Sequence, residues 1–176
     1  MKSIKELRTT LNFYPEEINS WLKQMAKKNI DFDVFLPTKG MNLQRDFVWN
    51  VFQKRELIWS ILMRRQIPRM AMINIITKES GTDGIYQVID GKQRLSTMID
   101  FYNNKFQLEI DNKLYFFKDL PDEYQTSISC YAIPYLIVNE DYGKKISDEE
   151  KINWFRFINF AGTQQDIEHI KRLTNS

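Results

Sequence analysis

Histidine and cysteine are nearly absent from this chain of 176 residues, which contains one of each. This scarcity excludes a structural zinc cluster, a disulfide within the monomer and an HNH-type nuclease centre, which needs histidines. We expect Cys130 to lie in an apolar strand as an inert small hydrophobe. We expect His169 to be a surface residue of the last helix.

Long apolar runs are also absent, since none approaches the roughly 18 residues of a membrane-spanning helix. The first residues lack the apolar stretch of a signal peptide, so we expect a soluble, reduced, cytoplasmic protein with no membrane partner. Hydrophobic residues make up 43% and aromatic residues 14%, which is enough for a packed core and excludes disorder. At roughly 150 residues per domain, the length predicts one domain over 1–176.

The chain has little excess charge, with 25 Lys+Arg against 23 Asp+Glu and a formal net charge of +2. A dedicated nucleic-acid binder is usually strongly basic, so a DNA-binding surface over the whole molecule is not indicated. Many basic residues lie in the first half and many acids in the second, which permits a local anion site. A local basic face from Arg64, Arg65 and Arg69 keeps DNA binding as the last of three alternatives.

Apolar spacing predicts both helices and strands. Helices are expected over 14–28, 51–65, 92–104, 121–127, 148–159 and 164–173. Strands are expected over 33–37, 70–77, 84–89 and 130–138, with a hairpin over 106–117, an irregularity at Pro134 and antiparallel pairing of 70–77 with 84–89. These elements predict a single α+β domain with a small mixed β-sheet flanked by helices, in which the helix over 14–28 is peripheral.

Two helix starts carry local signals. Pro15 suits the first turn of a helix, and Glu16 and Glu17 suit its positive end, so the first helix is expected to open there. Ser147 followed three residues later by Glu150 forms a capping box, which predicts the start of the helix over 148–159.

The strongest candidate site is the run Asp90-Gly91-Lys92-Gln93-Arg94 at a predicted strand-to-helix junction. A helix start offers unpaired backbone N–H groups and a positive dipole end, and glycine lets a ligand approach closely. Two cations in the first turn are unfavourable for the helix itself, so an external phosphate is a sensible reason for them. The alternative is that Asp90 is an ordinary N-cap and the cations are solvated.

Two further clusters are weaker on their own. Gln44 and Arg45 precede Phe47 and Trp49, which is typical of a loop that contacts a base or a phosphate; alternatively, the aromatics anchor the loop and Arg45 is solvated. The second of these clusters is the segment 159–163, where small and polar residues break the predicted helix. Its Gly162 is also explained by a purely structural role, as a left-handed C-cap.

The stretches 43–49 (LQRDFVW), 60–68 and 88–98 (VIDGKQRLSTM) occur in an order that resembles the N-terminal domain of the DUF262 family. Its relatives include GmrSD-type restriction enzymes that attack modified phage DNA, and 157–163 resembles the family's later Asn/Gly element. The resemblance implies a ParB/sulfiredoxin-like fold. It also implies nucleoside triphosphate (NTP) binding and hydrolysis that depends on a DGQQR element.

Carried over by position, Asp90, Gly91, Gln93 and Arg94 match that element, and Lys92 departs from its first glutamine. A lysine at this position can still bind phosphate, but it cannot perform a step that needs the side-chain amide of glutamine. Outside the turn, the predicted nucleotide contacts are Gln44, Arg45, Asn159 and Gly162. The proline expected just upstream of the first element is absent.

The leading hypothesis is an NTP-binding and hydrolysing module of a phage-defence or phage-encoded system. Arg94 and Lys92 would offset phosphate charge, Gln93 would position the attacking water, and Asp90 is the acid nominated for Mg²⁺. Longer family members carry a C-terminal HNH nuclease domain. This chain has a single histidine and cannot contain such a domain, so we expect no DNA cleavage by this chain alone. The alternative is a non-catalytic regulatory or anti-defence module that binds a partner nuclease or defence protein, and a homo-oligomer is compatible with either.

Overall fold

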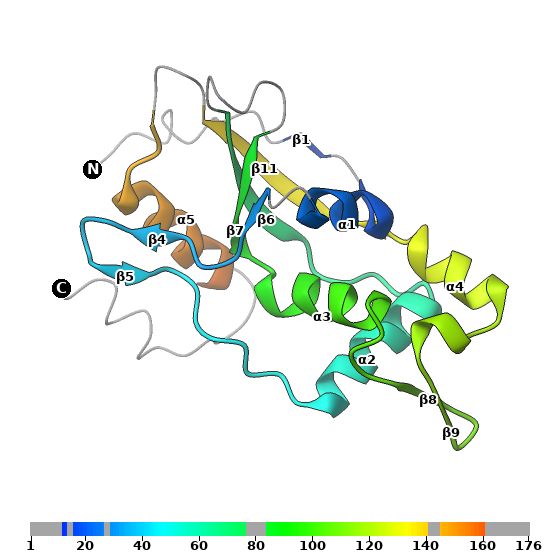
Figure 1. Cartoon of the computed structure of the whole chain (residues 1–176). Helices are drawn as coiled ribbons and strands as arrows, with labels where there is room; N and C mark the ends of the chain where they lie inside the picture. Colours follow the sequence, from blue (N-terminus) through cyan, green and yellow to red (C-terminus); the bar gives the residue numbers. More distant parts are fainter. Residues whose placement is uncertain (1–11, 14–15, 27–28, 77–83, 141–144, 161–176) are drawn as a thin grey trace.

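A five-stranded mixed sheet forms the centre of the protein, and helices cover both of its faces (Figure 1). The computed structural model describes residues 12–13, 16–26, 29–76, 84–140 and 145–160, and every structural statement concerns those residues. The helices are α1 (Ile18–Ala26), α2 (Val51–Leu62), α3 (Lys92–Tyr102), α4 (Asp122–Ser129) and α5 (Asp148–Phe160), with a short 3-10 helix at Phe117–Asp119.

The order of strands in the sheet is β1-β11-β6-β7-β3. Their bounds are β1 (Asn12–Phe13), β11 (Tyr135–Glu140), β6 (Met70–Ile75), β7 (Ile85–Asp90) and β3 (Ile30–Asp31). Strand β6 runs antiparallel to β7 and parallel to β11, and β3 runs parallel to β7. The predicted α+β class, mixed sheet and antiparallel pairing of the two central strands are therefore confirmed.

Three two-stranded ladders surround this sheet. They are β4 (Phe35–Leu36) with β5 (Met41–Asn42), β8 (Leu108–Ile110) with β9 (Lys113–Tyr115), and β2 (Glu16–Glu17) with β10 (Ala132–Ile133). The β8–β9 hairpin lies within the range predicted for it.

Side chains of the central strands alternate between two cores because successive residues of a strand point to opposite faces. Met70 and Met72 of β6 pack in one core with residues of α1, α2 and α3. Ala71 and Ile73 pack in the other with residues of α5 and the β4–β5 ladder. Figure 1 shows this division, with α5 and β4–β5 on one side of the sheet and the remaining helices on the other.

The N-terminal helix differs from its prediction in two ways. Glu16 and Glu17 form strand β2 against β10, so the helix begins at Ile18 rather than at the proline and the acids. The helix is also not peripheral, because Ile18 and Trp21 are fully buried. The Trp21 ring packs edge-on against Tyr86 of β7 at 5.5 Å between centroids, which joins α1 to the sheet.

The prediction for Cys130 is wrong. This residue is exposed and forms the C-cap of α4. The strand that follows, β10, begins at Ala132 and does not include it. The predicted irregularity at Pro134 is confirmed, since it separates β10 from β11. A proline has no N–H to donate to a ladder, and its carbonyl accepts from the Met70 amide at 2.9 Å.

At the start of α5 the predicted capping box is confirmed. The Glu150 carboxylate accepts from the backbone N–H of Ser147 at 2.8 Å, and the Ser147 hydroxyl accepts from the backbone N–H of Glu150 at 3.3 Å. The helix predicted over 164–173, with His169, lies outside the described residues. Across the part of the chain that is described, no helix is both long enough and apolar enough to span a bilayer.

Candidate functional site

The turn between β7 and α3 has the predicted strand–turn–helix form. Strand β7 ends at Asp90 and α3 begins at Lys92, with Gly91 between them at φ +107°. A Cβ on Gly91 would lie 2.6 Å from Cγ of Met70, so both the backbone conformation and the space require glycine here. Gly91 occupies the N-cap position of α3, and the interpretation of Asp90 as the N-cap is therefore wrong.

The Asp90 carboxylate instead holds Arg94, one helical turn further on. Nη2 of Arg94 donates to Oδ2 of Asp90 at 2.7 Å and to the Arg69 carbonyl at 3.3 Å. The two side chains are largely buried, with 14% of Arg94 and 21% of Asp90 exposed. The Arg94 Nε is buried and has no acceptor in the described part of the chain.

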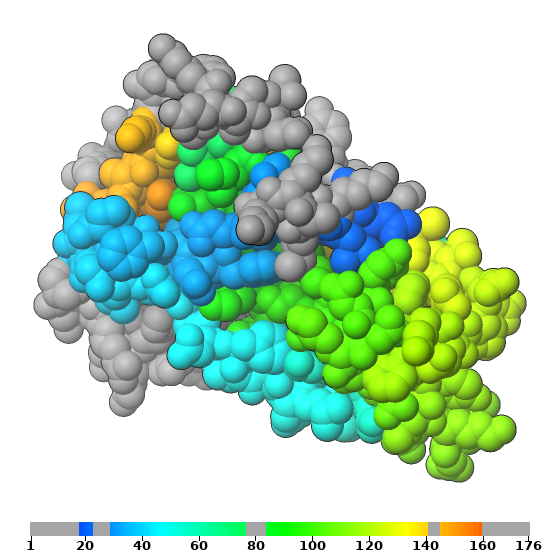
Figure 2. Space-filling view, in the orientation of Figure 1, coloured from blue at the N-terminus to red at the C-terminus, as the bar shows by residue number. Residues whose placement is uncertain are grey.

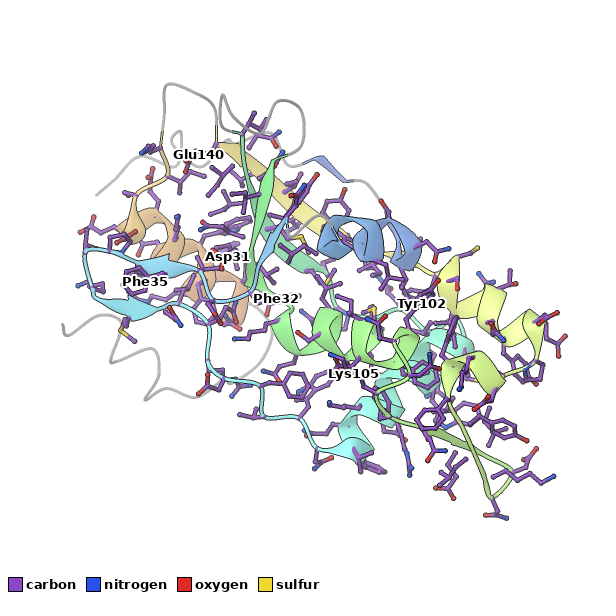
Figure 3. All side chains as sticks on the ribbon, in the orientation of Figure 1. Asp31, Phe32, Phe35, Tyr102, Lys105 and Glu140 are labelled. Atoms are coloured by element: carbon purple, nitrogen blue, oxygen red, sulfur yellow. The ribbon has the colours of Figure 1, made fainter. Side chains whose placement is uncertain are left out.

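Lys92 forms an ion pair with Asp33, which was not among the predicted site residues. Its Nζ lies 2.8 Å from Oδ1 of Asp33, and only 12% of the lysine side chain is exposed. The backbone N–H groups of Asp33 and Val34 both donate to Oδ1 of Asp31 at 3.0 Å, which fixes this turn. Figure 3 labels Asp31 on the segment that passes close to the start of α3. An Asx turn can be predicted from the local sequence. No local signal predicts the ion pair between Lys92 and Asp33, which are far apart in the chain.

Gln93 connects the helix start to the loop that precedes α2. Its Oε1 accepts from the backbone N–H groups of Val48 at 3.0 Å and Trp49 at 3.3 Å, and its Nε2 donates to the carbonyl of Asp46 at 3.0 Å. Both ends of the amide are thus bonded to backbone of the 46–49 loop. The two motifs found in the sequence therefore meet, and Gln93 is the joint between them.

Gln44 makes a second connection between the same motifs. Its Nε2 donates to the carbonyls of Val88 at 2.8 Å and Ile89 at 2.5 Å, near the end of β7. The neighbouring strand β3 pairs only with Tyr86 and Gln87, so the Gln44 amide satisfies backbone groups beyond the end of that strand.

The remaining predicted nucleotide contacts are Arg45, Asn159 and Gly162. Arg45 is exposed and has no ion pair or hydrogen bond with the described residues. Asn159 is buried on α5, where its Nδ2 donates to the carbonyl of Phe155 at 2.7 Å within the same helix. Gly162 lies outside the described residues. Of the two residues that the structure describes, Arg45 is the one with unused donors exposed to solvent.

An open groove of about 400 Å³ lies beside Arg94. One wall is a single face of α2 together with Trp49 from the loop before it, and the other is the segment that leads into β6. The lining residues are Trp49, Phe52, Gln53, Glu56, Leu57, Ser60, Gln66, Ile67, Pro68 and Arg94. In Figure 2 the cyan atoms of α2 and the loop before it lie along the lower edge of the molecule.

The acids of the described residues do not form a metal cage. No group of three or more His, Cys, Asp or Glu side chains among them could hold an ion. Asp90 has one oxygen bonded to Arg94, and Oδ1 remains. A single carboxylate fits Mg²⁺ that arrives with a polyphosphate, because Mg²⁺ commonly keeps waters and phosphate oxygens as its other ligands.

The fold and the turn define a small α+β domain with a strand–turn–helix junction beside a groove. The chain matches the family described as GmrSD restriction endonuclease, N-terminal domain, over residues 20–173. This range covers most of the 176 residues, so the chain belongs to that family, and the predicted relationship is confirmed. The protein is a restriction-related module. No curated protein and no solved structure matches the chain, and the ParB/sulfiredoxin-like fold stays a prediction.

Proposed function

We propose that this protein binds and hydrolyses a nucleoside triphosphate as a module of a restriction or phage-defence system. The observation that carries the proposal is the position of Arg94. Its guanidinium borders the groove, and of its nitrogens only Nη2 is hydrogen-bonded to the described residues. Guanidinium groups pair well with phosphate oxygens. Nη1 is not buried and has no acceptor among the described residues, so it suits a phosphate oxygen.

The first turn of α3 adds to this site. The backbone N–H groups of residues 92–94 precede that of Leu95, which is the first to donate within the helix, to the Gly91 carbonyl at 2.9 Å. An anion at a helix start is favoured by these donors and by the helix dipole. Lys92 lies in the same turn and is paired with Asp33, as Arg94 is paired with Asp90. Of the two cations, Arg94 is the one that lines the groove.

Hydrolysis requires a water to attack the γ-phosphorus as the bond to the bridging oxygen breaks, which yields a nucleoside diphosphate and inorganic phosphate. Asp90 would hold Mg²⁺ through Oδ1, and the ion would neutralise charge on the phosphates. Arg94 would stabilise the negative charge that develops on the bridging oxygen. Gln93 is saturated by backbone apart from one N–H, so we assign it the positioning of the 46–49 loop rather than the orientation of the water.

A phosphate-release assay with ATP, GTP, CTP and UTP and Mg²⁺ tests the proposal. Wild-type protein is expected to release phosphate above background, and Arg94→Ala to lose at least tenfold in rate. Arg156→Ala, on α5 across the sheet, is the matched control and is expected to retain the rate. Equal background release from wild type and Arg94→Ala would refute hydrolysis.

A second candidate, a nucleotide-gated module without turnover, is favoured by one observation. In the described structure Arg94 is closed onto Asp90 by a 2.7 Å bond, an arrangement that a bound phosphate would compete with. Isothermal titration separates the two candidates, since binding without phosphate release identifies the gated module.

A further inference from the structure

One face of α2 lines the groove with groups that suit the edge and the faces of a nucleobase. Phe52, Gln53 and Glu56 line it at spacings of three and four residues, which places them on the same side of the helix, and Trp49 joins them from the loop before α2. Phe52 is 67% exposed, an unusual state for a large aromatic side chain in a groove. Exposed aromatic faces are the surfaces on which bases stack.

The polar groups on this face are arranged as a donor beside an acceptor. Oε1 of Gln53 accepts from the Asn50 backbone N–H at 3.0 Å in the capping box of α2, so the amide is oriented and Nε2 is left to donate. Glu56, three residues on, makes no ion pair or side-chain hydrogen bond with the described residues. Its two carboxylate oxygens therefore have no partner among the described residues, and both Glu56 and Gln53 line the groove.

We infer that this face selects a guanine base, with Glu56 as the residue that reads it. Guanine carries adjacent N1–H and N2–H donors, which one carboxylate can accept together, and next to them O6, which Gln53 can reach as a donor. Adenine and cytosine each offer one donor group on this edge, flanked by an acceptor. Uracil offers one N–H between two carbonyls, and one of these carbonyls would face the carboxylate.

The inference rests on the proposed function, because Arg94 lines the same groove and would hold the phosphates of the same nucleotide. The groove volume of about 400 Å³ is within the range of small-molecule sites. The opposite charges of Arg94 and Glu56 fix the direction in which a nucleotide lies, with phosphates at the guanidinium and the base along α2.

Isothermal titration of the full chain with nonhydrolysable analogues of GTP, ATP, UTP and CTP, each with Mg²⁺, tests the inference. The GTP analogue is expected to bind about tenfold more tightly than the other three. Inosine triphosphate lacks the 2-amino group and is expected to bind several-fold more weakly than GTP. Equal affinity for all four bases would overturn the base reading and leave phosphate binding intact, whereas no binding of any analogue would overturn the proposed function itself.

A pair of variants assigns the preference to one side chain. Glu56→Gln is expected to abolish the preference for guanine, because an amide presents one acceptor and one donor in place of two acceptors. Glu123→Gln, an exposed acid on α4, is the matched control and should keep the preference. Thermal melting of both variants verifies folding. Retention of the full guanine preference by a folded Glu56→Gln protein would contradict the assignment.

Discussion

Arg94 donates to Asp90 at 2.7 Å across one turn at the start of α3. A cation in the first helical turn is unfavourable next to the positive end of the helix, and the carboxylate one turn earlier offsets that cost. The acid therefore supports the arginine at the border of the groove. This relationship explains why the first and last residues of the motif, Asp90 and Arg94, are of opposite charge and lie four positions apart.

Replacing Asp90 with Asn is expected to separate its two roles. The amide oxygen can still accept from Arg94, but the negative charge that repels phosphate is gone. We expect Asp90→Asn to bind a nucleotide several-fold more tightly than wild type without Mg²⁺, and to lose the increase in affinity that Mg²⁺ brings. Titrations with and without EDTA measure both effects. An unchanged dependence on Mg²⁺ would remove Asp90 from metal binding.

Gln93 is expected to act on the loop rather than on the reacting water. Gln93→Leu removes the acceptor for the Val48 and Trp49 amides and should raise their hydrogen-exchange rates at least tenfold. Gln93→Glu retains an acceptor for both amides and should preserve most of their protection. Amide exchange measured by NMR reports this directly. Unchanged protection in Gln93→Leu would contradict the role of a joint between the two motifs.

Gly91→Ala is expected to destabilise the fold by about 2 kcal/mol or more, since it adds a contact with Met70 to an unfavourable positive φ. Gly40→Ala is the matched control. Gly40 also has a positive φ, +64°, but a Cβ there would meet nothing within 4 Å, so about 1 kcal/mol is expected. Urea unfolding compares the two variants, and equal losses would show that the contact with Met70 is unimportant.

Tyr131 gives the fold a dependence on high pH. Its hydroxyl donates to the Arg65 carbonyl at 2.8 Å, and burial raises the pKa of Tyr131 above its ordinary value of 10.0. A raised pKa in the folded state means that the stabilisation is complete below about pH 10 and is lost as pH rises through the folded pKa. The free energy of unfolding of wild type should therefore fall more steeply above pH 10 than that of Tyr131→Phe. Parallel curves for the two proteins would contradict this.

The local parts of the site were predictable from sequence because local chemistry determines them. A buried apolar strand, an Asp-Gly pair and a helical apolar stripe define the β7–α3 turn within one short segment. The capping box at Ser147 and the break at Pro134 have equally local causes. At Glu16 and Glu17 the local helix signal failed, because pairing with β10 outweighed it.

The connections between segments could not be predicted in the same way. Gln44 and Gln93 are of a residue type that is common in ligand-binding sites. Only the fold shows that the side-chain amide of each bonds to the backbone of the other motif. The pairing of Asp33 with Lys92 joins residues 59 positions apart, and an exposed acid in a turn gives no sign of a distant partner. The groove likewise exists only where α2 faces the segment before β6.

The central claim is that Arg94 and the start of α3 bind polyphosphate, and isothermal titration of wild type and Arg94→Ala with a nonhydrolysable GTP analogue and Mg²⁺ tests it most directly. We predict saturable binding to one site of the wild type and at least a hundredfold loss in Arg94→Ala, with Arg156→Ala unchanged. Equal affinity of wild type and a folded Arg94→Ala protein, or the absence of binding to the wild type, would contradict the account.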